Sequence, residues 1–135
     1  MDKAEVYGKR IIEASPSQGV LLAIKNLISN NYEVSIISHK SKYPYKGPKY
    51  NLHDAAMLWL EKNNFISNNY DGISEKNIFF NLTKKEKIDK IHCLDCNFFI
   101  DDLPEILHMI EDKVKKILYS PQNIKTSDNY LILKK

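Results

Sequence analysis

The sequence predicts an α/β fold in which a mostly parallel sheet lies between two layers of helices. Short runs rich in β-branched and aromatic residues alternate with longer segments whose apolar residues recur every three or four positions. Helix-start signals stand between these runs, so successive strands are expected to be joined by crossover helices. With 135 residues, 43% of them hydrophobic, the chain is long and apolar enough for one domain with a single core.

The first half of the chain is expected to hold two helices around one strand. A Ser-Pro-Ser-Gln capping box that begins at Ser15 should start the first helix, with Pro16 at its first helical position. Asn30 should end it, because asparagine tolerates the left-handed backbone conformation. A short strand over residues 34–38 and a polar loop follow. The apolar spacing from Leu52 onward then predicts a second helix.

The second half continues the alternation. Thr83 opens another capping box, and Pro104 is well placed to open a later helix. The expected elements are a strand at 77–82, a helix from 83, a strand at 98–100, a helix from 104, and strands at 117–119 and 130–133. This order predicts a Rossmann-like three-layer domain that spans residues 1–135.

Polar side chains follow three of the expected strands. Ligands of an open α/β sheet bind beyond the carboxyl ends of its strands, so these side chains are the candidates for a site. A hydroxyl, a lysine pair and two carboxylates suit a phosphate and a divalent cation. The candidates are Ser38, Lys84 and Lys85 for phosphate, and Asp101 and Asp102 for Mg²⁺.

Each candidate also has a simpler interpretation. Lys84 and Lys85 could be solvated residues of a lysine-rich chain, and many strands end in a serine such as Ser38. One aspartate could cap the helix that begins at Pro104. A cap explains one carboxylate but not two adjacent ones, which repel each other unless a cation or a lysine compensates them. Lysines in the first turn of a helix also oppose its dipole, which indicates an anion nearby.

These strand ends resemble three of the four motifs of the haloacid dehalogenase-like hydrolases. Residues 36–38 resemble the second motif, Lys85 at the start of its helix the third, and residues 98–102 the fourth. The resemblance implies that Ser38 binds the phosphoryl group and that Lys85, or Lys84 in its place, steadies the charge. It also implies that the two acids hold Mg²⁺, with Asp102 in direct contact. The implied activity is Mg²⁺-dependent hydrolysis of a phosphomonoester.

A narrower resemblance, to a small bacterial subgroup of the same superfamily, covers about residues 7–119. It includes the loop that follows Ser38. This loop borders the expected phosphate site and is the expected contact with a phosphorylated small molecule. The residues assigned to that contact are His39, Lys40, Lys49 and Tyr50.

The sequence departs from the family at the first motif. That motif is a central strand that ends in Asp-x-Asp, whose first Asp attacks phosphorus and whose second acts as general acid and base. No Asp-x-Asp precedes Ser38. The expectation is an N-terminally incomplete domain, inactive as this chain alone.

Three explanations for the departure are open. The strand could belong to a lost or upstream-encoded segment, residues 1–14 could supply a substitute, or the open sheet edge could pair differently in a homo-oligomer. The alternative function is a non-catalytic binding or assembly protein of the same fold.

The composition limits which binding partners and which cellular location are expected. The net charge of +3 is too small to predict a nucleic-acid binder, although lysines and tyrosines interleaved over residues 39–50 keep RNA as a remoter option. No apolar stretch predicts a signal peptide or a membrane span, so a cytoplasmic protein is expected. Cys93 and Cys96 have the spacing of a zinc pair, but no second pair exists, and ordinary thiols are expected.

Overall fold

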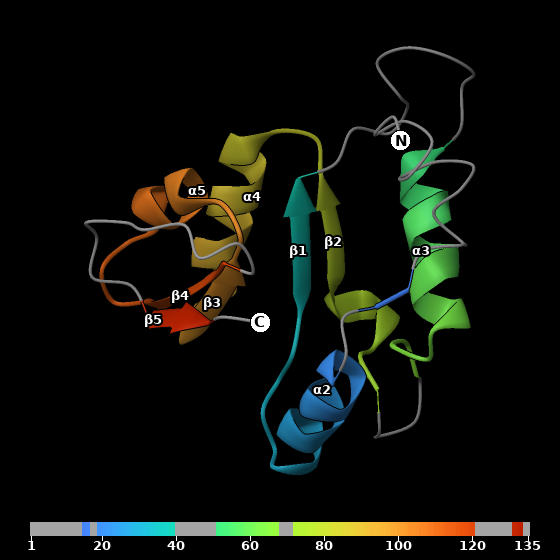
Figure 1. Ribbon diagram of the computed structural model, residues 1–135. Coiled ribbons are helices and arrows are strands. Elements are labelled where there is room, and N and C mark those ends of the chain that lie inside the picture. The colour runs from blue at the N-terminus through green and yellow to red at the C-terminus, as the bar shows by residue number, and fades with distance from the viewer. Residues whose placement is uncertain (1–14, 17–18, 40–50, 68–71, 121–130, 134–135) are drawn as a thin grey trace. The chain divides into compact units, whose positions relative to one another are not determined.

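The computed structural model describes residues 15–16, 19–39, 51–67, 72–120 and 131–133 (Figure 1). The chain divides into two compact units, Met1–Thr83 and Lys84–Lys135. The prediction of a single domain over residues 1–135 remains a prediction. Within the described residues, no helix has both the length and the apolar character needed to cross a membrane.

The first unit contains a two-stranded parallel sheet. Strands β1 and β2 pair in a register that runs from Ile36 opposite Ile78 to His39 opposite Asn81. The described elements are α2 (Val20–Ser29), β1 (Ile36–His39), α3 (Leu52–Lys62), the 3₁₀ turn η2 (Glu75–Asn77) and β2 (Ile78–Asn81). Because the strands are parallel, the carboxyl ends of β1 and β2 meet at one edge.

Asparagines set most of the helix ends in this unit. The side chain of Asn51 accepts a hydrogen bond from the backbone N–H of Asp54 at 3.0 Å and so caps the start of α3. Asn31 and Asn64 follow the ends of α2 and α3 with φ of 68° and 65°, the left-handed conformation expected after a helix. The expected end of the first helix is therefore confirmed.

The expected start of that helix is wrong. Pro16 is not helical, and α2 begins at Val20. Gly19 occupies the N-cap position with φ of 81°, a conformation that glycine adopts at little cost. The helix therefore starts after the left-handed turn at Gly19 rather than at the serine and proline before it.

Helix α3 supplies three of the buried side chains of the first unit and lies beside β2 in Figure 1. The rings of His53 and Phe80 stack with centroids 5.2 Å apart, which joins the start of α3 to the carboxyl end of β2. The buried apolar residues follow the helical spacing on α3 and alternate with exposed positions. They are Ile37, Leu52, Ala56, Leu60, Phe65 and Ile73.

The second unit contains a three-stranded parallel sheet in the order β3, β4, β5. Its elements are α4 (Lys84–Cys93), β3 (Phe98–Asp101), α5 (Pro104–Met109), β4 (Lys115–Tyr119) and β5 (Leu131–Leu133). Helix α5 contacts β3, β4 and α4. The buried apolar side chains of this unit include Ile88, Ile91, Ile106, Leu107, Val114 and Leu118. Burial of these side chains, each worth about 1.5–3 kcal/mol, holds the unit together.

The predicted α/β class and parallel pairing are confirmed in this coarse form. The described strands form two small sheets, one of two strands and one of three. The predicted helices from 52, 83 and 104 and the predicted strands at 77–82 and 98–100 are present to within two residues.

Candidate functional site

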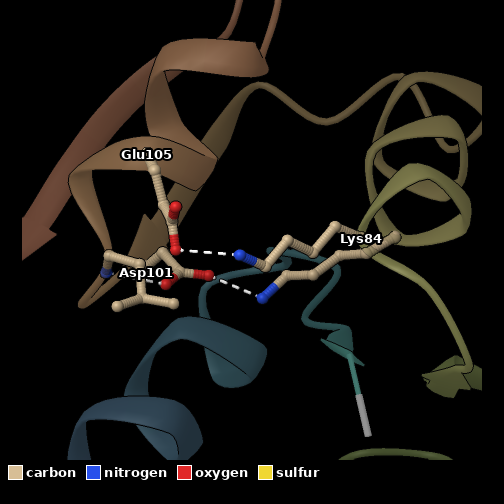
Figure 2. Close-up of polar contacts among 5 residues, drawn as sticks. Lys84, Asp101 and Glu105 are labelled. Carbon is tan, nitrogen blue, oxygen red and sulfur yellow. Dashed lines mark hydrogen bonds and ion pairs between the residues drawn. The ribbon is translucent and has the colours of Figure 1, made fainter.

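A buried ion pair lies at the carboxyl end of β3. Lys87 Nζ donates to Asp101 Oδ2 at 2.6 Å, and the two side chains are only 10% and 6% exposed. The other carboxylate oxygen, Oδ1 of Asp101, accepts the backbone N–H of Leu103 at 2.9 Å. Figure 2 shows this carboxylate between its donors. Both oxygens of Asp101 are therefore held in place.

The local fold explains why these two side chains meet. Lys87 shares the inward face of α4 with Ile88 and Ile91, which are buried. Side chains of a strand alternate between its faces, so Phe99 and Asp101 point to one side of β3. Lys87 Nζ lies 5.6 Å from the centroid of the Phe99 ring, so that side is the one facing α4.

Asp102 completes this group of charges as an exposed neighbour of Asp101. Partial desolvation, followed by the hydrogen bond with and repulsion from the Asp101 carboxylate, raises the pKa of Asp102 above its ordinary value. The positive charge of Lys87 opposes this rise. Lys87 therefore offsets part of the negative charge of the two carboxylates, although the net effect on the pKa of Asp102 is still a rise.

The structure places Lys87, and neither of the predicted lysines, beside Asp101. Lys84 Nζ pairs with Glu105 Oε1 at 3.0 Å on the surface, as Figure 2 shows. Lys85 pairs with Asp89 at 3.3 Å one turn along α4, and its side chain is 85% exposed. The signal that singles out Lys87 is its position next to Ile88 and four residues, about one helical turn, before Ile91 on the apolar face of the helix.

The carboxyl ends of β1 and β2 carry a second set of polar side chains, in the first unit. Ser38 is half-buried at the end of β1. The Nε2–H of His39 donates to the carbonyl oxygen of Leu82 at 3.1 Å, which joins the two strand ends. Lys40, Lys49 and Tyr50, the other residues expected to contact the substrate, lie outside the described residues.

Asn81, the last residue of β2, was not singled out from the sequence. Its Nδ2 is buried and has no hydrogen-bond partner in the described part of the chain. A buried donor without a partner is rare in folded proteins and calls for a physical explanation. The sequence offers no signal for it beyond a polar residue at the end of an apolar strand.

The two carboxylates at the end of β3 are the type of ligand that Mg²⁺ takes, and they are too few for a metal that needs many protein ligands. Mg²⁺ is commonly bound by one or two carboxylates and completed by water and phosphate oxygens. Asp101 and Asp102 supply two carboxylates. Among the described residues, no group of three or more His, Cys, Asp and Glu side chains could hold a metal ion. Cys93 and Cys96 form no disulfide bond in the described part of the chain.

Comparisons of the chain with protein-family models, with curated proteins and with solved structures gave no match.

Proposed function

We propose that this chain is a phosphatase-type protein of the haloacid dehalogenase-like class that binds Mg²⁺ and a phosphorylated small molecule. The proposed domain is the three-layer, Rossmann-like fold of that class. The observation that supports it is the buried Lys87–Asp101 ion pair beside Asp102 at the carboxyl end of β3. These are the residue types and the strand position that the third and fourth motifs of the class require.

The burial of the ion pair argues for a role beyond stability. A buried ion pair is often no more stabilising than a well-packed apolar pair, because both charges must leave water. Asp101 ends the parallel strand β3, and Lys87 reaches it from α4 with its Nζ. Ligands of α/β sheets bind at such strand ends. A positive charge fixed there favours an anion, and the neighbouring carboxylates favour a divalent cation.

The roles of the residues follow from their contacts. Asp101 is oriented by Lys87 Nζ and by the Leu103 N–H, so it is a fixed carboxylate. Asp102 is more exposed and is the carboxylate proposed to contact Mg²⁺ directly. When bound, Mg²⁺ would neutralise charge on the phosphoryl oxygens. Lys87 takes the charge-steadying role first assigned to Lys85, with Lys84 and Lys85 contributing surface charge.

Ser38 is the proposed phosphoryl ligand at the end of β1. Its hydroxyl can donate to a phosphoryl oxygen, and it is half-buried rather than fully solvated. The described end of β1 also carries His39, which is held by its hydrogen bond to Leu82. The proposed ligand class is therefore a phosphorylated small molecule.

Hydrolysis by this chain alone is not part of the proposal. The 135 residues contain no Asp-x-Asp sequence, so the aspartate nucleophile and its partner acid/base of the class are missing. The assay is release of phosphate from an aryl phosphate in Mg²⁺, with Asp102→Ala as the control. We expect no turnover above the control from a chain whose circular dichroism shows that it is folded.

Turnover that depends on Mg²⁺ and disappears in Asp102→Ala would mean that another nucleophile acts, and the proposal of binding without hydrolysis would be wrong. Binding itself is measured by calorimetric titration of inorganic phosphate into the chain in Mg²⁺. Absence of a binding signal at millimolar phosphate would end the proposal.

A non-catalytic assembly role is the second candidate, and the open face of β3 favours it. Phe98 and Ile100 point away from α4 and are 50% and 53% exposed. In the described residues β3 pairs with β4 alone. A homo-oligomer that covers this strand should dissociate in Ile100→Lys. Sedimentation velocity of the wild type and this variant tests it, and a wild type that is monomeric at high concentration would exclude it.

A further inference from the structure

The end of β2 carries a buried hydrogen-bond donor that has no acceptor among the described residues. Asn81 is the last residue of β2 and lies opposite His39 in the parallel register. Its Nδ2 is shielded from solvent and is without a partner in the described residues. The residue as a whole is half-buried, so it is partly exposed to solvent.

The chemistry around Asn81 favours an anionic acceptor. The segments 36–39 and 78–83 contain no Asp or Glu. Ser38 adds a hydroxyl that can donate. The ring of His39 already donates to the Leu82 carbonyl and so does not compete for Asn81. A donor-bearing strand end without carboxylates suits an oxyanion, and this is the edge of the sheet where ligands bind.

We infer that the Asn81 amide is a ligand-binding donor that turns outward to hydrogen-bond a phosphoryl oxygen. The terminal torsion of asparagine is broad, so rotation of the amide meets little resistance. The nitrogen gives up no hydrogen bond to the described residues when it turns, because it makes none with them. The ligand thereby satisfies a donor that the described residues leave without an acceptor.

This inference rests on the proposed function, since it takes the phosphoryl group as the ligand and Ser38 as its neighbouring donor. It adds a residue that the resemblance does not assign. It also makes a separate claim, that a buried amide contributes to affinity and not to stability.

The experiment is calorimetric titration of inorganic phosphate, at fixed Mg²⁺, into the 135-residue chain and its variants. Asn81→Asp keeps the size and shape of the side chain but replaces the donor by a negative acceptor. Asn64→Asp is the matched control for charge, because Asn64 is exposed and follows the far end of α3. Ser38→Ala tests the proposed function on its own.

We expect phosphate affinity to fall at least tenfold in Asn81→Asp and to stay within about twofold of the wild type in Asn64→Asp. Asn81→Ala, which removes the donor without adding charge, should weaken phosphate about threefold to tenfold and serves if Asn81→Asp does not fold. Equal affinities in Asn81→Asp and Asn64→Asp, with Ser38→Ala weakened, would overturn this inference alone. A wild type that binds no phosphate would overturn both it and the proposed function.

Discussion

Strands β2 and β3 each end in a residue with buried polar atoms, but only at the end of β3 do those atoms have hydrogen-bond partners among the described residues. Asp101 ends β3 and has a donor at each carboxylate oxygen, Lys87 Nζ and the Leu103 N–H. Asn81 ends β2, and its Nδ2 has no acceptor in the described part of the chain. The comparison teaches that one strand end is completed by its own helix. At the other, the amide nitrogen has no acceptor among the described residues, and we propose that a bound ligand supplies one.

Loss of Lys87 is the change with the largest expected effect. Lys87→Met should lower the free energy of unfolding by about 3–5 kcal/mol, because it leaves the Asp101 carboxylate buried without a counter-charge. Urea denaturation measures it. The matched control is Lys85→Met on the same helix, where loss of an exposed pair should cost less than about 0.5 kcal/mol. Equal effects of the two variants would contradict the difference in burial.

A second change at Asp101 should restore part of that stability. In Lys87→Met with Asp101→Asn, the buried charge is gone, while the asparagine oxygen can still accept the Leu103 N–H. We expect the double variant to recover about half of the loss, roughly 2 kcal/mol. A double-mutant cycle in urea gives the coupling energy. Strictly additive losses would show that the two side chains do not act as a pair.

Removal of the Asn81 amide should stabilise the chain. Asn81→Leu should raise the free energy of unfolding by about 1 kcal/mol, because a buried donor without an acceptor is destabilising and leucine has none. The same variant should weaken phosphate binding, so stability and affinity change in opposite directions. A loss of stability in Asn81→Leu would mean that the amide has a structural partner, and the contrast between the two strand ends would fail.

The smallest expected effect concerns Asp102 and pH. Its pKa is raised in the folded state, so the ionised carboxylate costs stability at neutral pH. That cost is relieved as the pH falls through the folded-state pKa and is gone below the unfolded value. Asp102→Asn should therefore raise Tm by about 1–2 °C at neutral pH, a small effect because the group is largely exposed.

The gain in Asp102→Asn should vanish in acid. Differential scanning calorimetry over a pH series measures it, with the exposed Asp112→Asn as the comparison. A gain that grows toward low pH would have the wrong sign and would contradict the raised pKa.

Most of the helices and strands could be predicted from local signals in the sequence. Asn30 and Pro104 mark helix ends through backbone preferences that act within a few residues, so they could be recognised without the fold. The prediction of where α2 starts was wrong because two local signals competed. The serine and proline at residues 15–16 suggested a start that Gly19, in its left-handed conformation, sets four residues later.

The site was predicted less completely for a physical reason. Asp101 ends an apolar strand, and that position was enough to make it a candidate. The choice among Lys84, Lys85 and Lys87 depends on which side of α4 packs inward, and that is settled by Ile88 and Ile91 rather than by the start of the helix. Whether the Asn81 amide has a hydrogen-bond acceptor depends on atoms distant in the sequence, so no local pattern predicts it.

The most direct test of the account is the dependence of phosphate affinity on Mg²⁺, measured by calorimetry in the wild type, Asp102→Asn and Asp112→Asn. Asp112 is exposed and lies in the same unit, so its variant matches the change of charge. The account predicts that Mg²⁺ strengthens phosphate binding at least tenfold in the wild type and in Asp112→Asn but not in Asp102→Asn. Phosphate affinity that is indifferent to Mg²⁺, or a response to Mg²⁺ that survives in Asp102→Asn, would contradict it.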